Sequence, residues 1–286
     1  MEPPVHEPVP RPKPSSGEVQ PRRVPGLLDI DLPRFDPAGT FNLQFNPRFR
    51  DLLKRGYIRV PTGVRWTADE TTEFNVEVEA YFTHGLKHAD TGNGLGEVRF
   101  GARRLLPRWP QPEFETSVGL NFEFPVGRPP VDMTDGLNHV TASVVTEHHY
   151  PSRRNWTEFA GITLDFVTAS SVAGTLVPNM PDDDSISFTG GVVYQQFRLV
   201  WTLQGTYTTT LISGGNDHFF TLSPSVLWFA PRKYTWNSRT QWVLGLGFRS
   251  TWGPDGHDFS TRSRVRAEIT FRQALDRLRS AFEKSR

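Results

Sequence analysis

The sequence predicts an all-β protein, a single up-and-down antiparallel transmembrane β-barrel of about twelve strands. Segments in which polar and apolar residues alternate recur about twelve times along the chain, an even number. Most of them have ten or more residues, which exceeds the usual strand of a soluble sheet and suffices to cross a membrane at a tilt. Short turns and longer loops alternate between these segments, as in membrane barrels.

Composition supports this class and excludes others. Of the 286 residues only 36% are hydrophobic, yet 12% are aromatic, and no apolar run is long enough for a transmembrane helix. The absence of cysteine excludes disulfides and thiolate metal sites. A net charge of +1 gives no reason to expect a nucleic-acid partner. We therefore expect no nucleic acid and no cofactor.

Residues 1–33 hold nine of the 24 prolines and are expected to form a disordered arm. An alternative is that this arm folds back to line or plug the barrel. The start, Met1-Glu2-Pro3-Pro4, has neither the basic residues nor the apolar run of a signal peptide. Either the chain is a mature form given a starting Met, or it stays in the cytoplasm.

The barrel is expected to occupy residues 34–271. Its clearest strand is EFNVEVEAYF at 73–82, where Phe74, Val76 and Val78 alternate with glutamate and asparagine. The glycine-rich stretch 91–106 is not a phosphate loop, because a period of two follows its glycines where a helix should begin. The expected strands lie near 41–45, 58–66, 73–82, 97–106, 114–124, 139–150, 156–168, 185–196, 198–212, 218–230, 239–252 and 261–271.

The connections between these strands fall into two classes. Tight turns are expected on one side of the membrane and longer loops on the other. The tight turns lie at 68–71, 108–112, 151–154, 196–198 and 231–236, and the loops at 84–95, 126–138, 169–184, 213–217 and 253–259.

One face of the strands is strongly charged and also carries the small residues Gly63, Gly101 and Gly119. Glycine on the concave side relieves crowding where a sheet curves, so this face is expected to line the lumen, with the Phe-rich face toward lipid. Opposite charges on neighbouring strands would either stiffen the wall or form a track for solutes. The residues expected to line and constrict the lumen are Arg59, Arg65, Glu73, Glu77, Glu79, Arg99, Arg103, Glu113, Glu115 and Glu123.

Two stretches resemble the Gram-negative outer-membrane family named for the MetA pathway of phenol degradation. VPTGVRWTADETTEFNVEVEAYF (60–82) is similar to that family's strand–turn–strand unit, and GLGEVRFGARRLLP (94–107) to its glycine-led strand. The resemblance implies a transporter of about twelve strands for small, often hydrophobic molecules, without catalytic residues. The chain departs from the family in lacking a visible signal peptide and in continuing past Phe271, the expected closing aromatic.

Residues 272–286 are expected to form a short amphipathic helix, since Ala274, Leu275, Leu278 and Phe282 recur at helical spacing. The helix would pack on the barrel rim or on a protein partner, or else dock on the membrane surface.

Two further groups of residues are candidate sites. His148, His149, Ser152 and Asn155 hold the residue types of a hydrolase triad, but consecutive histidines in a strand point to opposite faces. The acidic loop residues lack the alternate spacing of calcium ligands and are expected to be solvated. These are Asp132, Asp135, Asp182, Asp183 and Asp184. We therefore expect no enzyme activity.

The predicted function is a narrow channel for small molecules in the bacterial outer membrane, with the lipid bilayer and a small solute as its partners. The alternative is a structural barrel with a closed lumen, which anchors a complex through its N-terminal arm and C-terminal tail.

Overall fold

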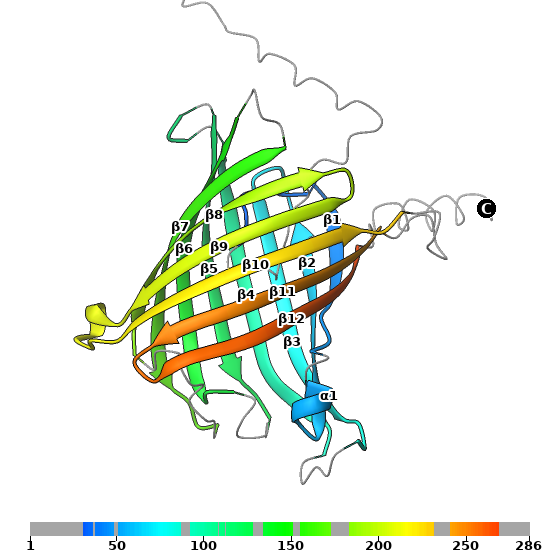
Figure 1. Cartoon of the computed structure of the whole chain (residues 1–286), viewed down its shortest axis with the longest axis vertical. Coiled ribbons are helices and arrows are strands. Elements are labelled where there is room, and N and C mark those ends of the chain that lie inside the picture. Colours follow the sequence, from blue (N-terminus) through cyan, green and yellow to red (C-terminus); the bar gives the residue numbers. More distant parts are fainter. Residues whose placement is uncertain are drawn as a thin grey trace, which may run out of the picture.

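In the computed structural model, twelve antiparallel strands close into one barrel in which each strand pairs with the next along the chain (Figure 1). The structure describes residues 31–36, 38–48, 51–86, 92–107, 109–111, 113–127, 134–150, 155–172, 183–231 and 241–268. The strands are β1 (Thr40–Phe45), β2 (Tyr57–Thr67), β3 (Thr72–Thr83), β4 (Gly94–Pro107), β5 (Phe114–Pro125), β6 (Leu137–His149), β7 (Trp156–Ala169), β8 (Ser185–Gln196), β9 (Leu199–Thr209), β10 (His218–Phe229), β11 (Gln241–Gly253) and β12 (Gly256–Glu268).

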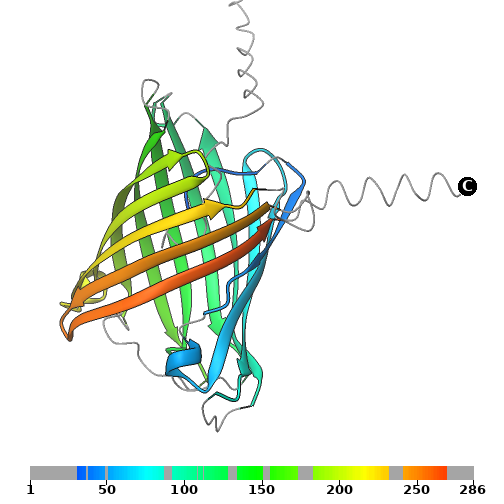
Figure 2. The same cartoon turned by 45° about the vertical axis from the view of Figure 1, so that its right-hand side comes forward.

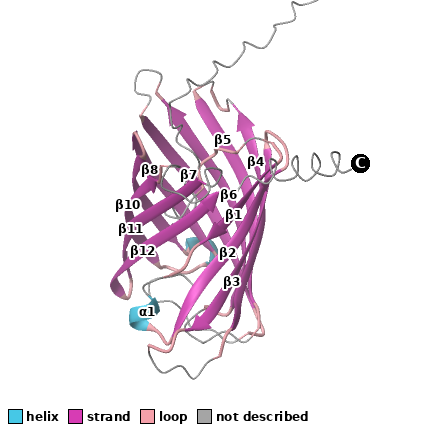
Figure 3. Cartoon of the chain, turned by 90° about the vertical axis from the view of Figure 1, so that its right-hand side faces the viewer, coloured by secondary structure: helices cyan, strands magenta, loops and turns pink. Residues whose placement is uncertain are grey.

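The barrel closes where β1 meets β12, with Phe45 opposite Val265. The strands run at a clear slant around the barrel (Figure 2). Helical structure within the described residues is confined to α1 (Asp51–Lys54) and the 3-10 turn η1 (Leu211–Ser213) (Figure 3). Among those residues no helix is long and apolar enough to cross a membrane.

The predicted all-β class, the twelve strands and their sequential antiparallel pairing are confirmed. One connection was predicted wrongly. β12 begins at Gly256 instead of near residue 261, because Gly253 pairs with Gly256 and the positive φ of Gly256 (107°) allows a tight turn. The tight turn expected at 231–236 lies almost wholly outside the described residues and remains an expectation.

The predicted arm and tail fall almost wholly outside the described residues. Residues 1–30 and 269–286 are not described, so the disorder expected for the arm and the helix expected at 272–286 remain expectations. The last residues of the expected arm, from Asp31 onward, are described and contact the barrel.

The two ends of the barrel differ in their connections. The short-turn end carries the connections β2–β3, β4–β5, β6–β7 and β8–β9, and the loop end carries α1, η1 and the connection between β7 and β8. In the β2–β3 turn the backbone N–H and the hydroxyl of Thr71 donate to Asp69 at 2.7 and 2.9 Å. Accepting these hydrogen bonds lowers the pKa of Asp69 and fixes the turn.

The side chains of the barrel are inverted relative to a soluble protein. Outward-facing Leu246 and Leu203 are 63% and 47% exposed, whereas inward-facing Glu73 and Gln204 are 0% and 1% exposed. On the inner face of β8–β11, hydroxyls pair across the ladder, as in Thr189 with Thr206 at 3.0 Å. Since a closed wall with an apolar exterior and a polar interior suits a lipid surround, this face assignment agrees with the sequence prediction.

Candidate functional site in the barrel lumen

Nine of the ten residues expected to line the lumen lie on strands β2 to β5, at positions that alternate with the outward apolar residues. They are Arg59 and Arg65 on β2, Glu73, Glu77 and Glu79 on β3, Arg99 and Arg103 on β4, and Glu115 and Glu123 on β5. Glu113 differs, because it precedes β5 and its side chain is exposed. We therefore leave Glu113 out of the lining.

The first charged cluster surrounds Arg99. Its guanidinium contacts Glu77 at 3.0 Å, Glu97 at 2.7 Å and Glu123 at 2.6 Å. Glu77, Arg99 and Glu123 are direct neighbours in the β3–β4–β5 ladder, so the strand register brings them together. One cation among three carboxylates leaves this part of the wall acidic. Glu97 was absent from the predicted set.

The second charged cluster lies where α1 meets the wall. Glu79 contacts Arg48 at 2.7 Å and Arg59 at 3.8 Å, and Arg59 contacts Asp51 of α1 at 2.8 Å. Arg48 lies between β1 and α1, and Arg59 lies on β2, so both cations beside Glu79 come from the part of the wall that adjoins α1.

Residues 31–36, here called the inner segment, supply the partner of the two remaining arginines. The Oδ2 atom of Asp31 accepts a hydrogen bond from Arg65 Nη2 at 2.9 Å and lies 3.5 Å from Arg103 Nη1. Arg103 Nη2 also donates to the carbonyl oxygen of Leu32 at 2.8 Å and to Ser117 Oγ at 3.1 Å. The guanidinium of Arg103 stacks over the ring of Phe35 at 5.1 Å.

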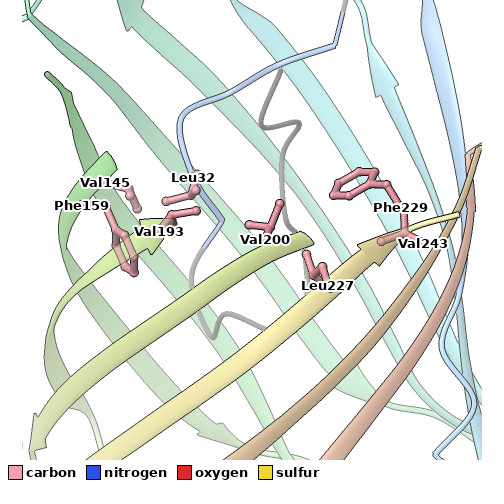
Figure 4. Packing of buried hydrophobic residues seen from close by; sticks show 8 residues of the cluster. All are labelled: Leu32, Val145, Phe159, Val193, Val200, Leu227, Phe229 and Val243. Atoms are coloured by element: carbon pink, nitrogen blue, oxygen red, sulfur yellow. The ribbon is translucent and has the colours of Figure 1, made fainter. Parts of the chain in front are cut away.

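Leu32 packs into an apolar patch inside the barrel and holds the inner segment there (Figure 4). The Leu32 side chain is 1% exposed. Its cluster partners lie on the inner register of six different strands, β6 to β11, all within a few residues of the short-turn end. They are Val145, Phe159, Val193, Val200, Leu227, Phe229 and Val243.

A buried ion pair fixes the other half of the inner segment. Arg34 Nε donates to the two oxygens of Glu147 at 2.7 and 2.9 Å, and Arg34 Nη2 donates to Thr157 at 2.8 Å. Glu147 is 0% exposed. Asn42 of β1 donates to Asp36. The inner segment thus contacts strands on opposite sides of the lumen and crosses its short-turn end.

A cavity of about 300 Å³ lies beside the inner segment, within the range of small-molecule sites. Asp31 forms part of its wall, and the remainder comes from β1 to β6. Polar groups dominate the inward-facing lining: Gln44, Arg65, Asn75, Glu77, Arg99, Asn121, Glu123 and Thr141.

The residues weighed as a hydrolase triad do not form one within the described part of the chain. His148 stacks on the ring of Phe114, with centroids 4.7 Å apart, and meets the ring of Tyr150 edge-on at 4.4 Å. Ser152 and the side chain of His149 lie outside the described residues. These aromatic contacts on the outer wall account for His148 without chemistry.

The acidic loop residues are engaged in ordinary contacts where they are described. Asp135 contacts His139 at 2.8 Å, and Asp184 accepts from the backbone N–H of Val167 at 2.8 Å. No cluster of metal-ligating residues occurs among the described residues, and Asp132 and Asp182 lie outside them.

Sequence reasoning missed the parts of the site that break the strand pattern. Val145, Phe159, Val193 and Leu227 are apolar residues at inward positions of otherwise polar registers. Their occurrence at matching ends of successive strands is a signal that something apolar is bound inside that end. Locating Leu32 as the bound group required the structure.

No protein-family model matches this chain, and no curated protein matches it. Solved structures do. The COG4313 outer membrane channel from Pseudomonas putida F1 is 11% identical, with a TM-score of 0.51, over 83% of this chain and 97% of that chain. The KdgM porin, solved also in complex with disordered oligogalacturonate, is 10% identical with a TM-score of 0.46, over 80% and 99%. The likeness to the COG4313 channel shows that this fold is the fold of an outer-membrane barrel.

Proposed function

We propose that the protein is a channel for small molecules in the bacterial outer membrane and that its inner segment holds the lumen closed. The observation that carries the proposal is the inversion of the wall, with an exposed apolar exterior around a charged interior. Such a wall is stable with lipid outside and water inside. The fold shared with an outer-membrane channel supports the same proposal.

The lining favours polar solutes over the hydrophobic ones that the sequence resemblance implies. Arg65, Glu77, Arg99 and Glu123 line the cavity, and a hydrocarbon would have to displace water from these groups without replacing their hydrogen bonds. We propose that the charged wall of β2 to β5 is the narrowest part of the pathway.

The closed-lumen scaffold is the second candidate, because the inner segment crosses the lumen. Planar-bilayer recording of the full chain separates the two candidates when it is combined with deletion of residues 1–33. A channel conducts, and conducts more after the deletion. If neither protein conducts ions or passes small solutes in liposome swelling, the channel proposal is wrong.

The orientation of the barrel gives a prediction about labelling. An epitope tag inserted beside Asp183, at the loop end, is expected to bind antibody on intact cells, because short turns face the periplasm in outer-membrane barrels. A tag beside Asp69, in the β2–β3 turn, should bind only after the outer membrane is permeabilised. The reverse pattern would contradict this orientation.

The Arg99 cluster gives a prediction about ion selectivity. Replacing Glu77, Glu97 and Glu123 together by glutamine leaves the charge of Arg99 unopposed. The open channel should then shift toward anions, measured as a change in reversal potential under a salt gradient. Glu158→Gln is the control, because Glu158 is exposed on the outer wall. An unchanged reversal potential would place the ion path away from Arg99.

A further inference from the structure

We propose that Arg65 and Arg103 form a binding site for the carboxylate of a small organic acid, and that Asp31 occupies this site while the lumen is closed. The inference rests on the proposed channel function and names the class of solute. Asp31 of the inner segment thus presents a carboxylate, which is the group that the site binds on the solute.

The two guanidinium groups converge on one oxygen atom. Arg65 lies on β2 and Arg103 on β4, with β3 between them, and both approach Oδ2 of Asp31. Arginine binds carboxylates best through two parallel hydrogen bonds, so a pair of arginines matches one carboxylate in charge and in geometry. Asp31 uses this arrangement incompletely, because its contact with Arg103 is 3.5 Å long.

The site retains unused donors. Within the part of the chain that the structure describes, the buried Nη1 atoms of Arg65 and Arg103 have no hydrogen-bond partner, and the Arg103 side chain is 6% exposed. Buried donors of this kind usually have partners, and each exception calls for an explanation. A free carboxylate, unlike one tethered through the backbone of the inner segment, is able to turn until it accepts from both groups.

Asp31 is the carboxylate that contacts both arginines. Glu73 lies opposite Arg103 in the β3–β4 ladder, yet Arg103 pairs with Asp31. When the inner segment leaves, Arg65 and Arg103 lose Asp31, just as Glu147 loses Arg34. A solute carboxylate then replaces Asp31 and relieves the repulsion between the two arginines.

The cavity supplies the rest of the solute site. Asp31 and Arg65 both line it, together with the polar side chains of Asn75, Asn121 and Thr141. Its volume of about 300 Å³ is at the lower end for ligand sites, which suits a compact acid with one ring and excludes long chains. A solute that enters from the loop end of the barrel reaches the cavity before it reaches the inner segment.

Uptake into proteoliposomes provides the first test, with benzoate and its neutral analogue benzamide as probes. Asp31→Asn removes the charge of the carboxylate that competes with the solute for the two arginines. Benzoate uptake should therefore rise about tenfold more than benzamide uptake, the factor typical of one charge-assisted hydrogen bond. Adding Arg65→Gln and Arg103→Gln should abolish this difference. Arg104→Gln, next to Arg103 but exposed, should preserve it.

Calorimetric titration of benzoate into the detergent-solubilised full chain provides the second test, which does not depend on conduction. Asp31→Asn should bind benzoate and lose binding when Arg65→Gln is added. Equal handling of benzoate and benzamide, or benzoate binding that survives loss of both arginines, would overturn the inference. Calorimetric binding without uptake by any variant would sink the channel proposal and leave the site intact.

Discussion

Leu32→Asp is expected to convert a barrel that is mostly closed into one that conducts steadily in planar bilayers. The substitution puts a carboxylate into the apolar patch formed by residues such as Val193 and Val200, and it leaves every wall residue unchanged. An unpaired charge in such a site costs several kcal/mol, which favours departure of the inner segment. Leu32→Met is the control, because it keeps volume and polarity and should remain closed.

The expected size of the effect follows from what holds the inner segment in place. Full burial of a leucine side chain stabilises by about 1.5 to 3 kcal/mol, and breaking a buried ion pair such as Arg34–Glu147 costs about 3 to 5 kcal/mol. Since about 1.4 kcal/mol is a factor of ten in population, these contacts keep the open state rare. Conductance of Leu32→Asp equal to that of Leu32→Met would show that the inner segment does not block the pathway.

The barrel itself could be predicted from the sequence because its signal is local and repeated. Alternation such as Phe74, Val76 and Val78 against Glu73 and Glu77 reports a strand wherever it occurs, and twelve such strands must close if no edge is to meet lipid. The turn before β12 was misplaced because β12 begins among residues that the sequence assigned to the preceding loop. Asp258 and Ser260 already lie on the inner register of the strand.

The charged residues could be assigned to a face but not to their partners. Whether Glu79 meets Arg99 or Arg59 depends on strand register, on a register shift between Glu79 and Ala80, and on the position of α1. None of these is encoded in the alternation of a single strand. Asp31 is an extreme case, because it lies in a proline-rich stretch whose composition predicts no structure at all.

The distinction between the two faces gives the second large effect. Leu203→Arg on β9 places a charge on the outer wall, at a side chain that is 47% exposed near the middle of its strand. A cation facing lipid near the bilayer centre costs about 2 to 4 kcal/mol of folding free energy. Thr206→Arg on the same strand points into the lumen beside Thr189, where water solvates the charge, and should cost under about 1 kcal/mol.

Reversible guanidinium unfolding in lipid vesicles measures both costs. Ser117 also faces inward, but it is a poorer site than Thr206 for the inward-facing arginine substitution. Ser117 accepts a hydrogen bond from Arg103 at 3.1 Å, so a second arginine there would add like-charge repulsion to any solvation effect. Equal destabilisation by Leu203→Arg and Thr206→Arg would mean that the outer wall does not face lipid. Folding of the unmodified chain in buffer free of lipid and detergent would mean the same, because the exposed aromatic and aliphatic exterior would then have to be stable in water.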